Sequence, residues 1–129
     1  MPTPHWFTPR SARLAALRLD VLARSVRREY RRLHAWAPPP VADGPVALEY
    51  FAAICAFHRI AASLAREGVL FRDLGKGWFE FPSKRAGRTV MLCWRLGQPV
   101  PAGWAERGER GVYRPIDDAG PWDDPSEAP

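Results

Sequence analysis

This chain of 129 residues has few of the residues that mark metal and redox sites. It contains two cysteines, Cys55 and Cys93, which form no CxxC pair, and three histidines without the spacing of metal ligands. A structural zinc site draws its ligands from such residues at short, regular spacings, so we expect no metal and no cofactor. Both cysteines lie in apolar segments, which predicts reduced thiols in a cytoplasmic protein.

Long apolar runs and a secretion signal are lacking as well. The sequence has no run of roughly 18 uncharged apolar residues, which predicts neither a transmembrane helix nor a membrane partner. The first residues, MPTPHWFTPR, lack the apolar core and cleavage site of a signal peptide. A chain of this length can bury one core but not two, so we expect a single domain.

Lysine is scarce, although the chain is basic. Only Lys76 and Lys84 are lysines, and the other 17 basic residues are arginine, for a net charge of +5. A weakly basic surface attracts polyanions at low salt. An excess of arginine with 14 prolines is also typical of a compositionally biased genome, so the charge alone indicates no partner.

Apolar residues at helical spacing predict two helices in the first half of the chain. The first begins at Pro9, behind Thr8 as N-cap, and stops before a run of three prolines. The second begins at Pro45 and ends near Glu67, before a glycine. The short connection between them predicts a long antiparallel helical hairpin over residues 9–67.

Each predicted helix has more apolar surface than one partner can cover. The first helix carries a strip formed by Leu14, Leu17 and Val21, nearly opposite its main apolar stripe. Either the sheet or a second copy of the chain must cover this strip, and we favour a homodimer through it. The second helix is apolar over more than half of its circumference, which predicts burial on more than one face.

Five arginines lie on one side of the second half of the first helix. Such a face is either solvated or binds the phosphates of a nucleic acid. The sequence has no recognition motif or stacking platform of the RNA-binding type, so we favour a solvated face over nucleic-acid binding. The five residues are Arg24, Arg27, Arg28, Arg31 and Arg32.

The hydrophobic period changes from 3.6 to 2 after the second helix, which predicts β-strands. We expect strands at 69–74, 78–81 and 88–96, with a tight turn at Gly75-Lys76-Gly77 and an end of the second strand at Pro82. They form a three-stranded antiparallel β-meander with one face on the helices.

The predicted fold class is therefore α+β, with one domain over residues 1–116. In this domain the helical hairpin packs on the β-meander of residues 69–96, and an irregular C-terminal loop over residues 97–116 crosses the sheet. The acidic, proline-rich tail over residues 117–129 is expected to be disordered.

Blocks of residues along the chain resemble one protein family. The most specific is the run Leu92-Cys93-Trp94-Arg95-Leu96-Gly97, preceded by Gly87-Arg88 and followed by Trp104, Gly111 and Arg114-Pro115. Further matches are Phe7-Thr8, Ala12, Leu14, Gly68-Val69, Arg72-Asp73-Leu74, Gly77 and Glu80-Phe81-Pro82. In these residues the chain resembles the DUF2203 family, small bacterial and archaeal proteins of unknown function. The resemblance implies kinship and a shared fold, and no activity.

Two positions depart from the family pattern. Relatives resemble W-H-[DE] around Trp104, where this chain has Ala105, so no role of that histidine carries over to it. The acidic residue that follows the LCWRLG block in the family is Gln98 here.

Ionisable residues near tryptophans form the candidate site. An arginine beside an aromatic ring can hold a carboxylate or phosphate through its planar fork of N–H donors. The same residues could instead be structural ion pairs that fix the C-terminal loop to the sheet. We expect Arg95 to pair with Asp73, Glu80 or Glu106. The candidate ligand-binding residues are Asp73, Glu80, Arg88, Arg95, Trp104, Glu106 and Arg114.

We assign no catalytic residue from the sequence. Cys93 lies in the middle of a predicted strand and no histidine follows it, which argues against a thiolate nucleophile. The chain is therefore expected to be a non-catalytic protein that binds an unknown protein or a small anionic ligand. The alternatives are nucleic-acid binding through the arginine face, and a small enzyme with a site between the meander and the C-terminal loop.

Overall fold

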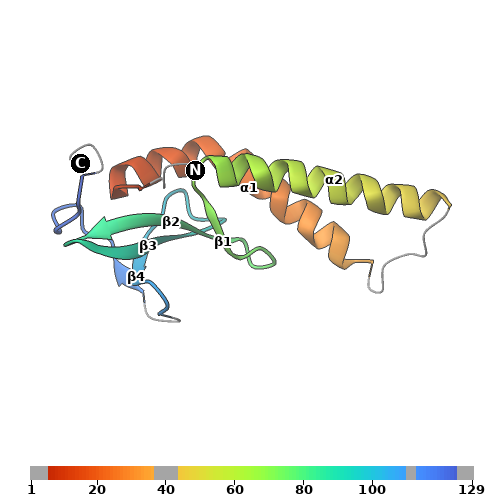
Figure 1. Cartoon of the computed structure of the whole chain (residues 1–129). Helices are drawn as coiled ribbons and strands as arrows, with labels where there is room; N and C mark the ends of the chain where they lie inside the picture. The colour runs from red at the N-terminus through yellow and green to blue at the C-terminus, as the bar shows by residue number, and fades with distance from the viewer. Residues whose placement is uncertain (1–5, 37–43, 110–112, 125–129) are drawn as a thin grey trace.

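The computed structural model describes residues 6–36, 44–109 and 113–124, and contains two helices and a five-stranded antiparallel sheet (Figure 1). The protein is thus α+β, as predicted. The strands lie side by side in chain order, β1 (Leu70–Asp73), β2 (Trp78–Arg85), β3 (Arg88–Arg95), β4 (Gly103–Glu106) and β5 (Arg114–Pro115).

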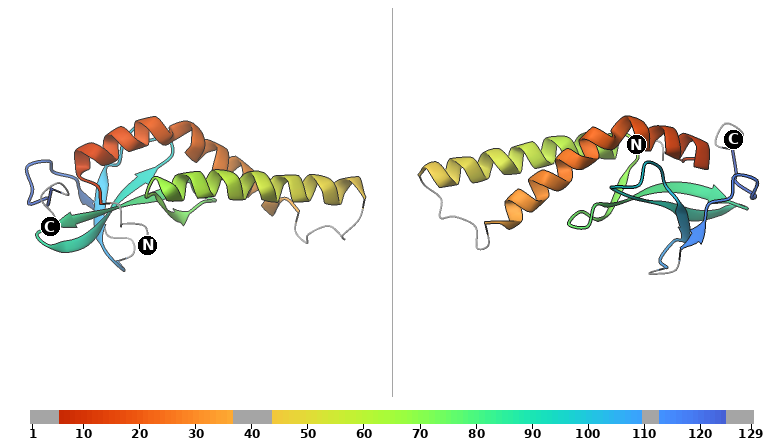
Figure 2. Two further views of the ribbon diagram at one scale, coloured as in Figure 1. Left: turned by 45° about the horizontal axis from the view of Figure 1, so that its top comes forward. Right: turned by 180° about the vertical axis from the view of Figure 1, so that it is seen from behind.

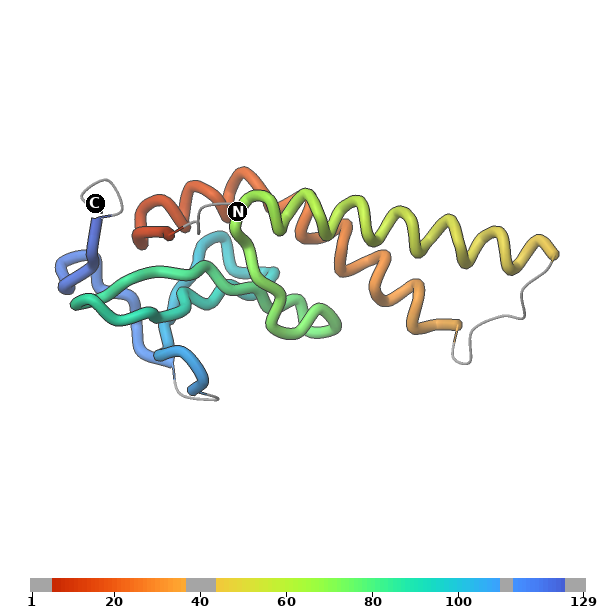
Figure 3. The backbone as a smooth tube through the Cα atoms, viewed as in Figure 1, coloured from red at the N-terminus to blue at the C-terminus, as the bar shows by residue number. Residues whose placement is uncertain are grey.

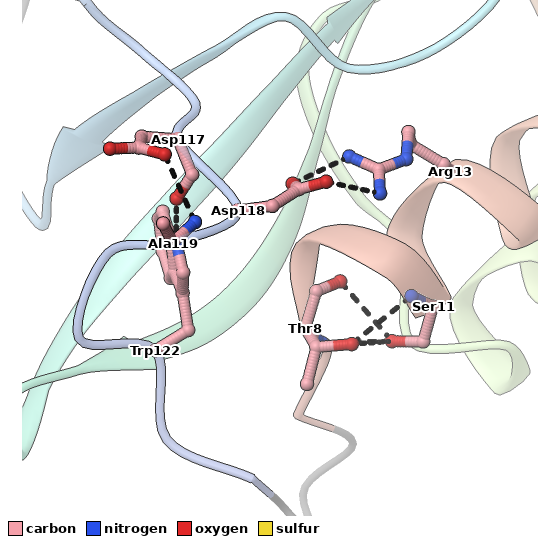
Figure 4. A network of polar contacts seen from close by, with 7 residues as sticks. All are labelled: Thr8, Ser11, Arg13, Asp117, Asp118, Ala119 and Trp122. Carbon is pink, nitrogen blue, oxygen red and sulfur yellow. Dashed lines mark hydrogen bonds and ion pairs between the residues drawn. The ribbon is translucent and has the colours of Figure 1, made fainter.

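Helix α1 spans Pro9–His34 and begins where the sequence predicts. The Thr8 hydroxyl accepts a hydrogen bond from the Ser11 amide at 3.1 Å, and the Ser11 hydroxyl accepts one from the Thr8 amide at 2.8 Å (Figure 4). This reciprocal cap satisfies two N–H groups that the helix itself leaves unpaired. Just before it, the Phe7 amide donates to the Pro82 carbonyl at 2.8 Å, which fixes the helix start to β2.

Helix α2 spans Pro45–Arg66, runs antiparallel to α1 and leads directly into β1 (Figure 3). An ion pair between Arg18 and Glu67, at 2.9 Å, joins the two helices near the sheet. The C-terminal part of α1 and the N-terminal part of α2 extend beyond the sheet (Figures 1 and 2). Only part of the helical layer therefore covers strands.

The core lies between α1 and one face of the sheet, which we call the inner face. Alanines at three positions let the helix approach the strands closely, and larger side chains fill the rest. The α1 residues are Ala12, Ala16, Leu19, Ala23 and Val26, and the sheet residues are Phe79, Phe81, Val90, Leu92 and Trp94, all at most 2% exposed. The predicted alternation along β2 and β3 is confirmed.

The second strand is longer than predicted, because Pro82 does not end it. The Pro82 carbonyl points away from β3, toward Phe7, and in an antiparallel pair the N and C=O of one residue point the same way. The missing N–H therefore costs no bond to β3. β2 continues to Arg85, and a two-residue turn follows in which Ala86 and Gly87 both have positive φ, 51° and 76°.

The segment predicted as an irregular loop, 97–116, contains the last two strands. β4 pairs with β3 through Leu92 and Trp104, and β5 pairs with β4 through Trp104 and Arg114. The three-stranded meander of the sequence analysis is therefore wrong, and the sheet has five strands. Strands of four and two residues are too short for alternation to stand out from the surrounding glycines and prolines.

Residues 117–124 also hold a defined position, although composition predicted disorder from Asp117. Asp118 accepts two hydrogen bonds from Arg13, at 2.7 and 2.8 Å (Figure 4). The Trp122 ring packs edge-on against Trp104 at 5.9 Å, and an isolated antiparallel β-bridge joins the backbone at Trp122 to that at Arg85 of β2. A single large aromatic residue gives this acidic segment apolar contact that its average composition hides. Residues 125–129 lie outside the described residues.

Helix α2 is more exposed than its composition predicts. Its buried residues are Ala47, Ala53 and Leu64, whereas Leu48 is 73% exposed and Phe51 55%. The predicted burial on more than one face is therefore wrong for the single chain. By length and composition alone α2 is also apolar enough to cross a membrane, whereas the sequence predicted no transmembrane helix.

Candidate functional site

The face of the sheet that points away from α1, here called the outer face, gathers most of the polar side chains of the strands. Trp78 lies opposite Arg95, and Glu80 lies opposite Cys93, in the register of β2 with β3. Arg72 of β1 lies at a register shift between Phe71 and Asp73, and it reaches this face because its side chain donates to Glu80. Three neighbouring strands thus present cationic, acidic and aromatic groups on one surface.

Two hollows indent the outer face. One has a volume of about 370 Å³ and is lined by Arg72, Trp78, Phe79, Cys93, Trp94, Arg95, Gln98, Ala102, Gly103, Tyr113, Arg114 and Pro115. The other measures about 490 Å³ and is lined by Phe71, Arg72, Asp73, Trp78, Glu80, Met91, Glu106, Arg107, Gly108 and Glu109. We call them the aromatic hollow and the acidic hollow. Arg72 and Trp78 line both.

Arg72 is held in place on the boundary between the hollows. Its guanidinium donates to a Glu80 carboxylate oxygen at 3.2 Å and to the Glu109 carbonyl at 3.4 Å. It also lies 5.6 Å from the centre of the Tyr113 ring. The Arg72–Glu80 pair is only 22% and 13% exposed, so each charge depends on the other for compensation.

Arg95 does not form the ion pair that we predicted. Its guanidinium lies over the Trp78 ring, 4.8 Å from the centroid, and no carboxylate among the residues that the structure describes forms an ion pair with it. The three predicted partners are engaged elsewhere. Asp73 accepts from the Lys76 amide in the β1–β2 turn, Glu80 binds Arg72, and Glu106 binds Arg88.

The Cys93 thiol lies in the aromatic hollow in an environment that keeps it protonated. Burial, together with the nearby Glu80 charge, raises the pKa of Cys93 to about 12, despite the opposing influence of Arg72 and a hydrogen bond with Tyr113. Burial likewise raises the pKa of the Tyr113 hydroxyl. A thiol of this kind is a poor nucleophile at neutral pH.

The remaining candidate residues form a second group at the β3–β5 edge of the sheet. Arg88 pairs with Glu106, and Arg114 pairs with Glu109 at 3.0 Å while it stacks on Trp104 at 4.9 Å. The hydrogen bond from Arg114 holds the pKa of the Glu109 carboxyl below its usual value. Of this group only Arg114 lines the aromatic hollow, and Trp104 is part of the core.

Most arginines of the predicted nucleic-acid face have partners within the chain. Arg27 and Arg31 each donate to the Gly75 carbonyl at 3.3 Å, which holds the β1–β2 turn against α1. The other contacts are Arg24 with Asp20 at 2.8 Å and Arg32 with Glu29 at 3.8 Å. At that turn Gly77 has a φ of 71°, and a Cβ there would lie 3.2 Å from that of Leu96.

Sequence reasoning missed three residues that shape the outer face, namely Arg72, Tyr113 and Glu109. Arg72 could have been found from the alternation of the predicted strand 69–74, which places it on the side opposite Phe71. Tyr113 directly precedes strand β5 and Glu109 follows strand β4. The sequence predicted that this segment crosses the sheet, but nothing in the spacing of the two residues indicated that it forms strands.

Comparison with known proteins gives one match. A family model described as an uncharacterized conserved protein, DUF2203, matches residues 6–109, and thus all elements from α1 to β4. Neither the curated proteins nor the solved structures contain a match to this chain.

Proposed function

The chain belongs to the DUF2203 family, and we propose that it is a cytoplasmic protein that binds a small organic anion in the aromatic hollow without catalysing a reaction. One observation carries the proposal. Arg95 lines the hollow and stacks on Trp78, and it forms no ion pair with the described residues, whereas Arg72, Arg88 and Arg114 all bind carboxylates.

The stacked geometry of Arg95 suits the recognition of an anion. A guanidinium that lies over an indole ring uses its flat face for the ring and keeps the N–H donors along its edge available. Those donors match the two oxygens of a carboxylate or phosphate. Contact with Trp78 also reduces the side-chain freedom that Arg95 would lose on binding, which favours affinity.

The rest of the hollow suits an apolar group attached to the anion. Its lining includes the outer-face aromatic residues Trp78 and Tyr113, and its volume of about 370 Å³ lies within the range of small-molecule sites. A bare inorganic anion would leave this aromatic surface unused. We therefore favour a ligand with a flat, apolar body and one anionic group.

A role in binding rather than catalysis is supported by the state of the one thiol in the hollow. With a pKa near 12, the Cys93 thiolate is negligibly populated at neutral pH. If the hollow were instead the site of a small enzyme, its nucleophile or base would have to be another group.

Isothermal titration calorimetry with phenyl phosphate tests this function, with inorganic phosphate and phenol as comparison probes. We expect the protein to bind phenyl phosphate more tightly than either, because inorganic phosphate lacks the aromatic ring and phenol lacks the anionic group. The Arg95→Gln variant should bind about tenfold or more weakly, since a hydrogen bond to a charged group contributes about 1.5–3 kcal/mol.

Arg28→Gln is the matched control, because it removes the same charge from an exposed position on α1, outside the hollow. It should leave the affinity for phenyl phosphate unchanged. Equal affinities in the Arg95→Gln variant and the wild type would contradict the proposal, as would an absence of binding by all three probes.

A further inference from the structure

The exposed side of α2 carries a regular stripe. Its members follow one another at alternating steps of three and four residues, and each is exposed in the single chain. In order they are Leu48, Phe51, Cys55, His58, Ala62 and Ala65. This spacing has the 3.5-residue period by which two helices stay in contact along their length.

Within residues 6–36, 44–109 and 113–124, no segment covers this stripe. α1 contacts α2 from the opposite side, where Ala53 and Leu64 are buried, and the N-terminal part of α2 extends beyond the sheet (Figures 1 and 2). A solvated helix face carries charged residues, whereas this one presents a leucine 73% exposed and a phenylalanine 55% exposed. Exposed apolar stripes of this kind mark interaction surfaces.

We propose that a second copy of the chain covers this stripe, with the two α2 helices antiparallel and crossing at Cys55. Positions equally distant from Cys55 then face each other across the interface. Leu48 faces Ala62 of the other copy, so the bulky end of each stripe meets the small end of its partner. In a parallel pair the two large residues of each copy would meet at one end and the alanines would leave a gap at the other.

Charge favours the same arrangement. Arg59 borders the stripe and lies four residues after Cys55, as far from it as Phe51 on the other side. The antiparallel pair therefore brings each Arg59 beside a Phe51 ring, a favourable cation–ring contact. A parallel pair would bring Arg59 against Arg59, and like charges across an interface oppose association.

The strip on α1 is the competing surface for self-association. Leu14, Leu17 and Val21 are 60%, 60% and 73% exposed, so neither the sheet nor α2 covers them. At the same spacing, however, the strip continues into Arg24 and Arg28. Two copies joined there would bring guanidinium groups together, whereas the α2 stripe stays uncharged along its length.

Cross-linking at Cys55 tests the proposed geometry. In a Cys93→Ala variant, Cys55 is the only thiol, and it lies on the proposed two-fold axis. A short bis-maleimide should convert most of this variant to a covalent dimer at micromolar concentration. A dimer in solution that fails to cross-link would refute the antiparallel crossing at this residue.

Sedimentation velocity of two further variants distinguishes the surfaces. We expect the wild type to be a dimer, Phe51→Arg to raise its dissociation constant about tenfold or more because it sets an arginine against Arg59 of the other copy, and Leu17→Arg to leave it unchanged. Both residues are exposed in the single chain, so both variants should keep the wild-type circular dichroism spectrum.

The opposite pattern, with only Leu17→Arg monomeric, would assign the interface to α1 and overturn the proposal. A monomeric wild type would also overturn it. If that monomer also bound to anionic lipid vesicles through Phe51, the stripe would be a membrane-binding surface instead.

Discussion

The two faces of the sheet are built from alternate residues of the same strands and have opposite properties. On the inner face Phe79 and Trp94 are fully buried under α1. One residue away along each strand, Glu80 and Arg95 lie on the outer face, where they line hollows open to solvent. One pair of strands thus supplies alternate side chains to the core and the remaining side chains to a candidate binding surface.

The largest expected difference between the faces is in stability. Trp94→Ala should lower the free energy of unfolding by about 3–5 kcal/mol, because it leaves a large cavity in the core. Cys93→Ala, one residue away on the outer face, should lower it by about 1 kcal/mol or less. Urea unfolding followed by circular dichroism measures both, and similar losses would contradict the assignment of the faces.

The chemistry of Cys93 should differ sharply from that of a free thiol. A rise of the pKa from 9.0 to about 12 reduces the thiolate fraction about 1,000-fold at neutral pH. In a Cys55→Ser variant we therefore expect Cys93 to react with a thiol reagent far more slowly than in the urea-unfolded protein. Rapid reaction in the folded state would show that the hollow does not protect this group.

Because of the same shift of the Cys93 pKa, the free energy of unfolding should depend on pH in the alkaline range. Because the pKa of Cys93 is raised, the Cys93 thiol keeps its proton in the folded state at pH values between 9.0 and about 12, at which the unfolded state has lost it. The contribution of the protonated Cys93 thiol to the free energy of unfolding is fully present below pH 9 and is lost as the pH rises toward 12. Cys93→Ala should abolish it, and an unchanged alkaline profile in that variant would assign the effect to other groups.

A smaller effect is expected from the buried polar group of the inner face. Ser83 is fully buried, and its hydroxyl donates to the Phe7 carbonyl at 2.5 Å. Ser83→Ala should lower the free energy of unfolding by about 1–3 kcal/mol, because the buried carbonyl loses a partner. Ser63→Ala on the exposed side of α2 is the control, and should stay within about 0.5 kcal/mol of the wild type.

The smallest effect concerns the arginines that hold the β1–β2 turn. Replacing Arg27 and Arg31 with glutamine should change the free energy of unfolding by no more than about 1 kcal/mol, since both contacts with Gly75 are long and partly solvated. Binding of a labelled single-stranded oligonucleotide should be negligible at physiological salt in both proteins. Tight binding that disappears in the double variant would instead support the nucleic-acid alternative.

The parts of the fold that the sequence predicted are those with strong local signals. Thr8 and Pro9 mark the start of α1, and alternation along β3 assigned Trp94 and Arg95 to opposite faces correctly. These features depend on neighbouring residues alone, which is why a single sequence contains them.

The parts that the sequence did not predict depend on contacts between distant segments. Pro82 is compatible with β2 only because its carbonyl faces Phe7, 75 positions earlier in the chain. Tyr113 reaches the outer face only because β5 returns to pair with β4. The pairing of Arg95 was predicted wrongly for the same reason, since the Glu80 carboxylate pairs with Arg72 of the neighbouring strand instead. Composition and local spacing give no information on these contacts between distant residues.

The most direct test of the outer face as a binding surface is a titration of the ¹⁵N-labelled protein with phenyl phosphate, followed by NMR. We predict that the largest shifts of backbone amide signals occur at Trp78, Cys93, Arg95 and Gly103, around the aromatic hollow. The amides of Ala16 and Leu19, which lie in the core under the inner face, should change little. Shifts that gather instead along the arginines from Arg24 to Arg32, or no shifts at millimolar ligand, would contradict the account.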